Sequence, residues 1–191
     1  MGRFIVRYKV DGFDCEKTTD PYTSMKEAEE HAQDIRGYEG VQYAIVVEKK
    51  QAAVSIVQSN DGSRYLVVWN KRYGTWSLPG GMVEDGESVL DAQYRELREE
   101  TGAITISATR CYECDVSGEP NRASHVVFYA VTIESAFVDL VDRIGERERG
   151  CPITYFTRDE LLKWSSFREW YAKALDAHSA LIAEQAISAD S

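Results

Sequence analysis

Residues 80–103 read GGMVEDGESVLDAQYRELREETGA, and this stretch decides how the rest of the chain is interpreted. Ser88 is a good helix N-cap, because its hydroxyl can accept a backbone N–H of the first turn. Gly102 suits the position just past a helix end, where the backbone often becomes left-handed. The stretch therefore predicts a helix from about Val89 to about Thr101.

One face of the predicted helix is expected to pack on a core. At about 100° per residue, side chains spaced three or four residues apart share a face of a helix. The side chains that recur in this way are Leu90, Tyr94, Leu97 and Thr101. We expect this stripe to anchor the helix on the body of its domain.

Another face of the same helix carries three glutamates within about one turn: Glu96, Glu99 and Glu100. Like charges at this spacing repel by a few tenths of a kcal/mol on a solvated helix. Arg95 and Arg98 are expected to point to the flank rather than into the cluster. Mg²⁺ prefers hard oxygen ligands and usually needs one or two carboxylates plus waters and phosphate. The three glutamates alone leave open both a magnesium site and an acidic solvated face.

The spacing of charged residues and glycines around this helix is highly specific. Gly81 is followed by five residues, then Glu87, seven further residues, and the run RELREETGA from Arg95 to Ala103. This pattern resembles the signature of the Nudix hydrolases, G-x5-E-x7-R-E-U-x-E-E-x-G-U, where U is a bulky aliphatic residue. Ala103 is the one departure, and its small size concerns packing rather than chemistry. The resemblance implies an α/β fold, a Nudix-type α/β/α sandwich with a mixed sheet.

The resemblance also implies roles for the charged and glycine positions of the signature. The metal ligands would be Glu96, Glu99 and Glu100 with the carbonyl of Gly81, and the cofactor would be Mg²⁺, with Mn²⁺ as a substitute. Arg95 and Glu87 would form an ion pair that holds the loop to the helix. Catalysis is assigned to the set Glu96, Glu99, Arg95 and Glu87, and for the ion pair of Arg95 and Glu87 the favoured interpretation is structural support without a part in catalysis.

The general base is less firmly assigned than the metal ligands. Relatives often use the first glutamate of the signature core, which is Glu96 here, but the base varies across the family. A carboxylate beside bound Mg²⁺ has a lowered pKa and is a weaker base. A glutamate from a later loop is therefore the alternative, and Glu146 and Glu148 lie in the right region, with Glu119 as a further choice.

The expected reaction is hydrolysis of a pyrophosphate bond in a nucleoside diphosphate linked to another group. Lys71 and Arg72 are candidate phosphate ligands, and Trp76 or Tyr73 is a candidate for stacking on a base. Gly80 permits close approach of the backbone to phosphate, since it has no Cβ. A nucleoside triphosphate is the first choice of substrate, ADP-ribose or a nucleotide sugar the second, and a dinucleoside polyphosphate the third.

A function without catalysis is the alternative. The Nudix fold also occurs in sensors and regulators that bind ADP-ribose-like ligands without hydrolysing them. Such proteins usually lack one or more of the signature carboxylates, whereas this chain keeps Glu96, Glu99 and Glu100. The intact signature therefore favours a hydrolase over a sensor.

Composition narrows the classes of partner. The 191 residues include 22 Lys and Arg against 32 Asp and Glu, a net charge of −10, which argues against binding of nucleic acid polymers or anionic membranes. We identify neither a signal peptide nor an apolar run long enough for a membrane span. The four cysteines, Cys111 and Cys114 among them, are then expected to be reduced thiols in the cytoplasm. On a regular strand these two would point to opposite faces. A homodimer stays open.

Two domains are expected, a small ββαβ unit over residues 1–50 and a Nudix domain over residues 51–191. In the first, Asp11-Gly12 is a hairpin signal and Ser24 to Glu27 resembles a capping box. The role of this unit is open. Strands in the second are expected over 52–58, 64–69, 76–81, 103–116, 124–133 and 153–156, with helices over 137–144 and 157–162. A last helix over 167–187 should bury Trp170, Tyr171, Ala174, Leu175, Leu181 and Ile182.

Overall fold

The computed structural model describes residues 4–12, 17–20, 22–48, 50–116, 123, 125–134 and 152–189. Its chain divides into two compact units, Met1–Lys50 and Gln51–Ser191. Several expectations fall outside the described residues: the helix over 137–144 and the residues Glu119, Glu146 and Glu148.

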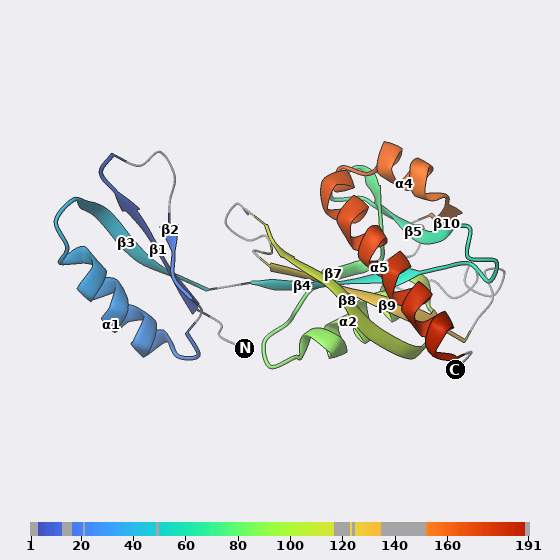
Figure 1. Ribbon diagram of the computed structural model, residues 1–191, viewed down its shortest axis with the longest axis horizontal. Helices are drawn as coiled ribbons and strands as arrows, with labels where there is room; N and C mark the ends of the chain where they lie inside the picture. The colour runs from blue at the N-terminus through green and yellow to red at the C-terminus, as the bar shows by residue number, and fades with distance from the viewer. Residues whose placement is uncertain are drawn as a thin grey trace. The chain divides into compact units, whose positions relative to one another are not determined.

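The first unit is a three-stranded sheet with one helix (Figure 1). Its elements are β1 (Phe4–Val10), β2 (Lys17–Thr18), α1 (Met25–Arg36) and β3 (Val41–Glu48). Both outer strands pair antiparallel to β1. Ser24 caps α1 by accepting the Glu27 N–H at 3.1 Å, and Ala28 and Ala32 pack against Val6 in a small core. The element order is the ββαβ order expected from the sequence.

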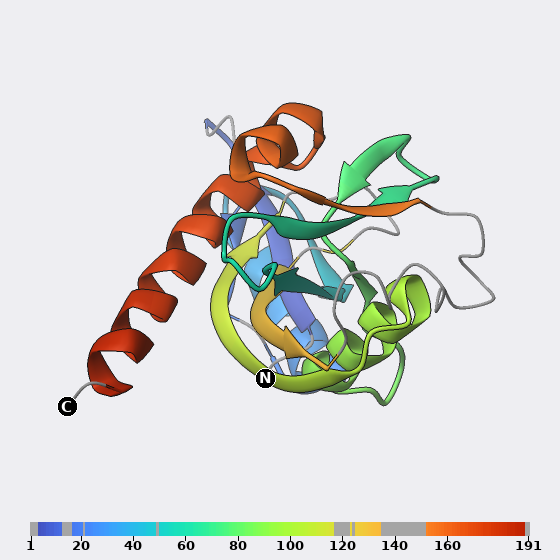
Figure 2. The same ribbon diagram turned by 90° about the vertical axis from the view of Figure 1, so that its right-hand side faces the viewer.

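The second unit contains two sheets and three described helices (Figures 1 and 2). A mixed sheet has the order β7-β4-β9-β8, in which β4 and β9 are parallel. A smaller antiparallel sheet has the order β10-β5-β6. The elements are β4 (Gln51–Val57), β5 (Tyr65–Asn70), β6 (Thr75–Ser77), β7 (Gly80–Met82), α2 (Val89–Thr101), β8 (Thr105–Asp115), β9 (His125–Ile133), β10 (Ile153–Phe156), α4 (Arg158–Trp164) and α5 (Arg168–Ala189).

The mixed sheet separates two hydrophobic clusters. Because side chains alternate along a strand, Val127 of β9 packs on one face in a cluster with Leu97 of α2. Phe128, the next residue, packs on the other face with Leu175 of α5. All four side chains are fully buried. Helix, sheet and helix therefore form the α/β/α sandwich that the resemblance implied.

Helix α2 has the predicted bounds but a different buried face. Leu90 and Tyr94, expected in the core, are 37% and 39% exposed, so this part of the prediction was wrong. The buried positions are Ala92, Gln93, Leu97 and Thr101. Gln93 is fully buried, and its amide nitrogen donates to the hydroxyl of Ser55 at 3.0 Å. The face of α2 that packs on the core therefore includes the polar side chain of Gln93 and not the side chains of Leu90 and Tyr94.

Strand β8 contains an irregularity that changes the direction of its cysteines. Its register against β9 shifts between Arg110 and Tyr112, so the simple alternation of side chains is interrupted there. Cys111 and Cys114 consequently pack against the same cluster, contrary to the expectation that they face opposite sides. Both are free thiols. Burial raises the pKa of Cys111 to about 11 and also raises the pKa of Cys114, which keeps both protonated.

Helix α5 is anchored by its first half. Tyr171, Ala174 and Leu175 are buried as predicted, but Ile182 is 42% exposed, so its assignment to the core was wrong. Figure 2 shows the last turns of α5 (red) extending away from the sheet. In the part of the chain that the structure describes, no helix is both long and apolar enough to cross a membrane.

The burial of His178 on α5 makes stability dependent on pH. This side chain is 3% exposed, its Nδ1 has no hydrogen-bond partner among the residues that the structure describes, and its ring lies edge-on to Tyr65 at 6.0 Å. Burial lowers the pKa of His178 below its ordinary value. The unfolded chain therefore binds this proton at higher pH than the folded chain, and stability falls as the pH drops below about 6.5.

We expect His178→Leu to remove this contribution. Between pH 7.5 and pH 5.5, the free energy of unfolding measured in urea should fall less in the variant than in the wild type. His31→Gln, at an exposed position of α1, is the control and should keep the wild-type pH dependence. Identical pH dependence in wild type and His178→Leu would contradict this interpretation.

Candidate functional site

Gly80 and Gly81 let β7 lie close to the backbone of β4 and to the side chain of Glu96. Gly80 pairs with Val54 of β4, and a Cβ on Gly80 would lie 2.3 Å from the carbonyl oxygen of Ala53. A Cβ on Gly81 would lie 2.4 Å from the carboxylate of Glu96. The missing side chain of Gly81 thus makes the space that the Glu96 carboxylate occupies.

The caps of α2 place the glutamates beside β7. Ser88 accepts the N–H of Asp91 at 3.1 Å at the start of the helix, and Gly102 ends it with a left-handed φ of 74°. Near that end, Glu100 Oε2 accepts the N–H of Gly80 at 2.8 Å. The helix and the strand of the signature are therefore joined directly through a carboxylate that belongs to the predicted metal set.

Arg95 fastens the loop between β7 and α2 to the helix. Its Nε and Nη2 donate to the two carboxylate oxygens of Glu87, each at 2.9 Å, and Nη2 also donates to the carbonyl of Met82 at 2.9 Å. The guanidinium lowers the pKa of Glu87 and keeps it ionised. The structure thus contains the Glu87–Arg95 ion pair that the resemblance implied, in the two-pronged form that arginine favours.

Arg95 also reaches into the glutamate cluster, which corrects the expectation that it points to the flank. Its Nη1 donates to Glu96 Oε1 at 2.7 Å and lies 3.5 Å from Glu99 Oε2. Both glutamates are within one helical turn of Arg95, so its fork can reach them while it holds Glu87. Arg98, by contrast, is exposed.

The electrostatics of Glu96 fit a divalent cation. The Glu96 side chain is only 17% exposed, and burial raises its pKa in spite of the bond from Arg95. Burial of a carboxylate disfavours its charged form, and a bound cation would favour it. Among the described residues no three acidic, histidine or cysteine side chains converge on one point. Mg²⁺ requires only one or two carboxylates when phosphate supplies further oxygens, and Glu96 and Glu100 both face one pocket.

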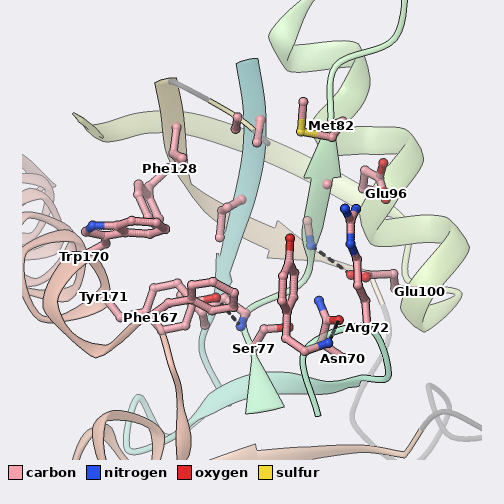
Figure 3. Close-up of a pocket in the computed structure, with 18 of the residues that line it drawn as sticks. Asn70, Arg72, Ser77, Met82, Glu96, Glu100, Phe128, Phe167, Trp170 and Tyr171 are labelled. Atoms are coloured by element: carbon pink, nitrogen blue, oxygen red, sulfur yellow. Dashed lines mark hydrogen bonds between the residues drawn. The ribbon is translucent and has the colours of Figure 1, made fainter. Parts of the chain in front are cut away.

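This pocket has a volume of about 620 Å³ and two chemically different ends (Figure 3). One end contains the charged and glycine residues Arg72, Gly80, Gly81, Glu96 and Glu100, with Lys71 also in the lining. The other end is apolar and aromatic, and it includes Phe128, Phe167, Trp170 and Tyr171. A ligand with a charged part and a flat organic part matches this division.

Of the residues predicted to bind substrate, some line the pocket and one does not. Lys71, Arg72 and Gly80 line the pocket, and in Figure 3 the Arg72 side chain points toward the end where Glu96 lies. The Arg72 guanidinium also lies 5.5 Å from the centre of the Tyr73 ring. Trp76 is outside the lining; its ring packs against Trp69 at 5.5 Å and Phe156 at 5.1 Å.

Sequence reasoning missed the aromatic wall of the pocket. Trp170 and Tyr171 were assigned to the core alone, and Phe167 was given no role. The structure places all three beside Phe128 in the pocket lining. The signal was present as three aromatic residues within five positions at the start of the last helix. Asn70 and Ser77, also in the lining, carried no comparable signal.

Comparison with known proteins identifies a domain family and partial relatives. The model of the NUDIX domain matches residues 49–177, well over half of the chain. An RNA pyrophosphohydrolase of Aeromonas hydrophila subsp. hydrophila is 45% identical over 60 residues, which cover 28% of this chain and 33% of that protein. A Bacillus subtilis protein named "Putative 8-oxo-dGTP diphosphatase" is 32% identical over 92 residues, 47% of this chain and 60% of that protein.

A solved structure agrees in fold. The NUDIX hydrolase from Nitrosomonas europaea superimposes with a TM-score of 0.55 and 19% identity, covering 68% of this chain and 90% of that one. At this identity the likeness concerns the fold alone. The matched region of the RNA pyrophosphohydrolase spans about a third of that relative's length.

The close approach at Gly80 gives a first test of the site. We expect Gly80→Ala to lower the free energy of unfolding by about 2–3 kcal/mol, because the new methyl group collides with the backbone of β4. Gly62→Ala is the control: Gly62 also has positive φ, but a Cβ there meets open space. Its cost should be about 1 kcal/mol, from backbone strain alone. Equal losses in the two variants would contradict the steric explanation.

The geometry of Arg95 gives a second test. Arg95→Lys keeps the charge but cannot form the two-pronged bond to Glu87 together with the bond to Met82. We expect a loss of about 2 kcal/mol in the free energy of unfolding of the metal-free protein in urea. Arg98→Lys, the same exchange at an exposed position of α2, should change it by less than about 0.5 kcal/mol. A tolerated Arg95→Lys would show that charge alone is sufficient.

Proposed function

The chain belongs to the NUDIX domain family, and from this membership we propose that it is a magnesium-dependent hydrolase of nucleotide pyrophosphate bonds. The observation that supports this most directly is the charged end of the pocket, where Glu96 and Glu100 meet Gly80 and Gly81. We assign the activity to residues 51–191, a compact unit of the structure. The role of residues 1–50 stays open.

The proposed metal ligands are Glu96, Glu99, Glu100 and the carbonyl of Gly81. A Mg²⁺ or Mn²⁺ ion bound by them would neutralise phosphate oxygens and make the phosphorus accessible to a nucleophile. The Glu99 side chain is 34% exposed and does not line the pocket, whereas Glu96 and Glu100 do. The role of Arg95 is to hold Glu96 in orientation and to fix the loop through Glu87.

Glu96 is our candidate general base, which would take a proton from the attacking water. Its carboxylate is held by Arg95 at 2.7 Å, and burial raises its pKa toward the range in which a base is effective near neutral pH. A bound cation acts in the opposite direction and lowers that pKa. Glu146 and Glu148 therefore stay alternatives from a later part of the chain.

A nucleoside triphosphate is the substrate that we place first. Arg72 and Lys71 would bind its phosphates, and the aromatic end of the pocket would accept a base by stacking. Two partial relatives bear names that refer to the pyrophosphohydrolysis of RNA and the hydrolysis of 8-oxo-dGTP. The net charge of −10 favours a small nucleotide over a nucleic acid polymer. ADP-ribose or a nucleotide sugar is second. We propose a cytoplasmic location for this activity.

A substrate panel tests the proposal. With Mg²⁺, the protein should release phosphate or pyrophosphate from at least one nucleoside triphosphate or nucleotide sugar. Glu99→Gln should lower turnover by about 100-fold while nucleotide binding, measured by calorimetry, is retained. Glu184→Gln removes an exposed carboxylate of α5 and should have wild-type turnover.

The same panel identifies the non-catalytic alternative. If the wild type hydrolyses none of the nucleotides with Mg²⁺ or Mn²⁺ but binds ADP-ribose, the protein is a sensor and the hydrolase proposal fails. Uptake of no divalent ion, with or without nucleotide, would also exclude the proposed mechanism.

A further inference from the structure

The two sheets of the second unit are connected by a buried crossing beside the site. Strand β6 ends at Ser77 in the smaller sheet, and β7 begins at Gly80 in the mixed sheet. Only Leu78 and Pro79 lie between them, and Leu78 is 1% exposed. Buried backbone N–H and C=O groups need partners, so the bonds made by this crossing determine where β7 begins.

Three elements supply those partners at three successive residues. The N–H of Leu78 donates to the hydroxyl of Tyr171 on α5 at 3.1 Å. The carbonyl of Pro79 accepts the N–H of Ser55 on β4 at 2.8 Å. The N–H of Gly80 donates to Glu100 on α2 at 2.8 Å. Figure 3 shows the first and third of these bonds as dashed lines.

Tyr171 is itself held firmly. It is 4% exposed, and its ring packs edge-on against Phe128 at 6.1 Å and in a tilted arrangement against Phe167 at 5.7 Å. Burial raises the pKa of Tyr171, so its hydroxyl stays neutral. A fixed ring with a neutral hydroxyl presents an acceptor at a constant position to the Leu78 N–H.

We propose that Tyr171 is a positioning residue for the charged end of the pocket. By accepting the Leu78 N–H it fixes the crossing, and thereby the place of Gly80 against Glu100 and of Gly81 against Glu96. This control comes from α5, on the face of the mixed sheet opposite α2. The consequence for turnover rests on the proposed hydrolase function, whereas the effect on the backbone does not.

Tyr171 is also part of the aromatic end of the pocket. The ring of Tyr171 therefore borders the region proposed for the nucleotide base. Its hydroxyl, bonded to Leu78, acts on the region proposed for the phosphates. A phenylalanine at this position would keep the ring and lose only the bond to Leu78. Ligand binding by the ring should then survive while the alignment of the reacting bond is lost.

Tyr65 offers a matched control in the same hydrophobic cluster. It is 6% exposed, and its hydroxyl accepts a long 3.5 Å contact from the amide nitrogen of the Gln58 side chain. Tyr65→Phe removes the same atom from the same core but leaves the crossing between the sheets untouched.

The first experiment needs no activity. Amide hydrogen exchange should be measured by NMR on the full chain without ligand, in wild type, Tyr171→Phe and Tyr65→Phe. In Tyr171→Phe we expect the Leu78 amide to exchange at least about tenfold faster, with a smaller increase at Gly80, relative to the amide of Val127 in the sheet. Tyr65→Phe should leave these ratios unchanged. An unchanged Leu78 ratio in Tyr171→Phe would overturn the proposal.

The second experiment uses the nucleotide that the substrate panel identifies. Tyr171→Phe should lower kcat by about tenfold or more, with KM within about twofold of wild type, and Tyr65→Phe should match wild type. A raised KM with unchanged kcat would mean that the hydroxyl binds ligand, and would overturn the positioning role. If the wild type hydrolyses nothing, the proposed function fails, and the exchange measurement alone decides whether Tyr171 positions the crossing.

Discussion

The guanidinium group of Arg95 is the contact on which the geometry of the site most depends. It binds a carboxylate from the loop, the carbonyl of Met82 in β7 and a carboxylate from its own helix, all at 2.7–2.9 Å. Together these bonds hold Glu87 and Glu96 on either side of the Arg95 guanidinium. The missing side chain of Gly81 on β7 leaves space for the Glu96 carboxylate.

Local features of the fold were predictable from the sequence because they are determined by neighbouring residues. The bounds of α2 follow from Ser88 and Gly102, and both caps act within a single turn. The buried face of α2 was predicted wrongly because Gln93 is buried through Ser55, a residue far away in the sequence. The direction of Cys111 was wrong because a register shift against β9 cannot be recognised from β8 alone.

The same distinction applies to the site. The spacing of the signature placed Glu87, Arg95 and the glutamates on one loop and one helix, and the structure has them there. The aromatic wall could not be derived in this way, because Tyr171 reaches the pocket from a helix on the other side of the sheet. The direction of the Trp76 side chain could not be predicted either. Its position four residues before Gly80 does not reveal that its ring packs against Trp69.

The parallel pairing of β4 with β9 has a consequence for how the protein is made. Gln51 is paired with His125, so the sheet cannot close until the ribosome has released the chain as far as β9, and such non-local pairings form slowly. The wall at Phe167 and Tyr171 emerges later still. Helix α2 can form early on the nascent chain, but the cavity beside it is complete only after Tyr171 has left the ribosome.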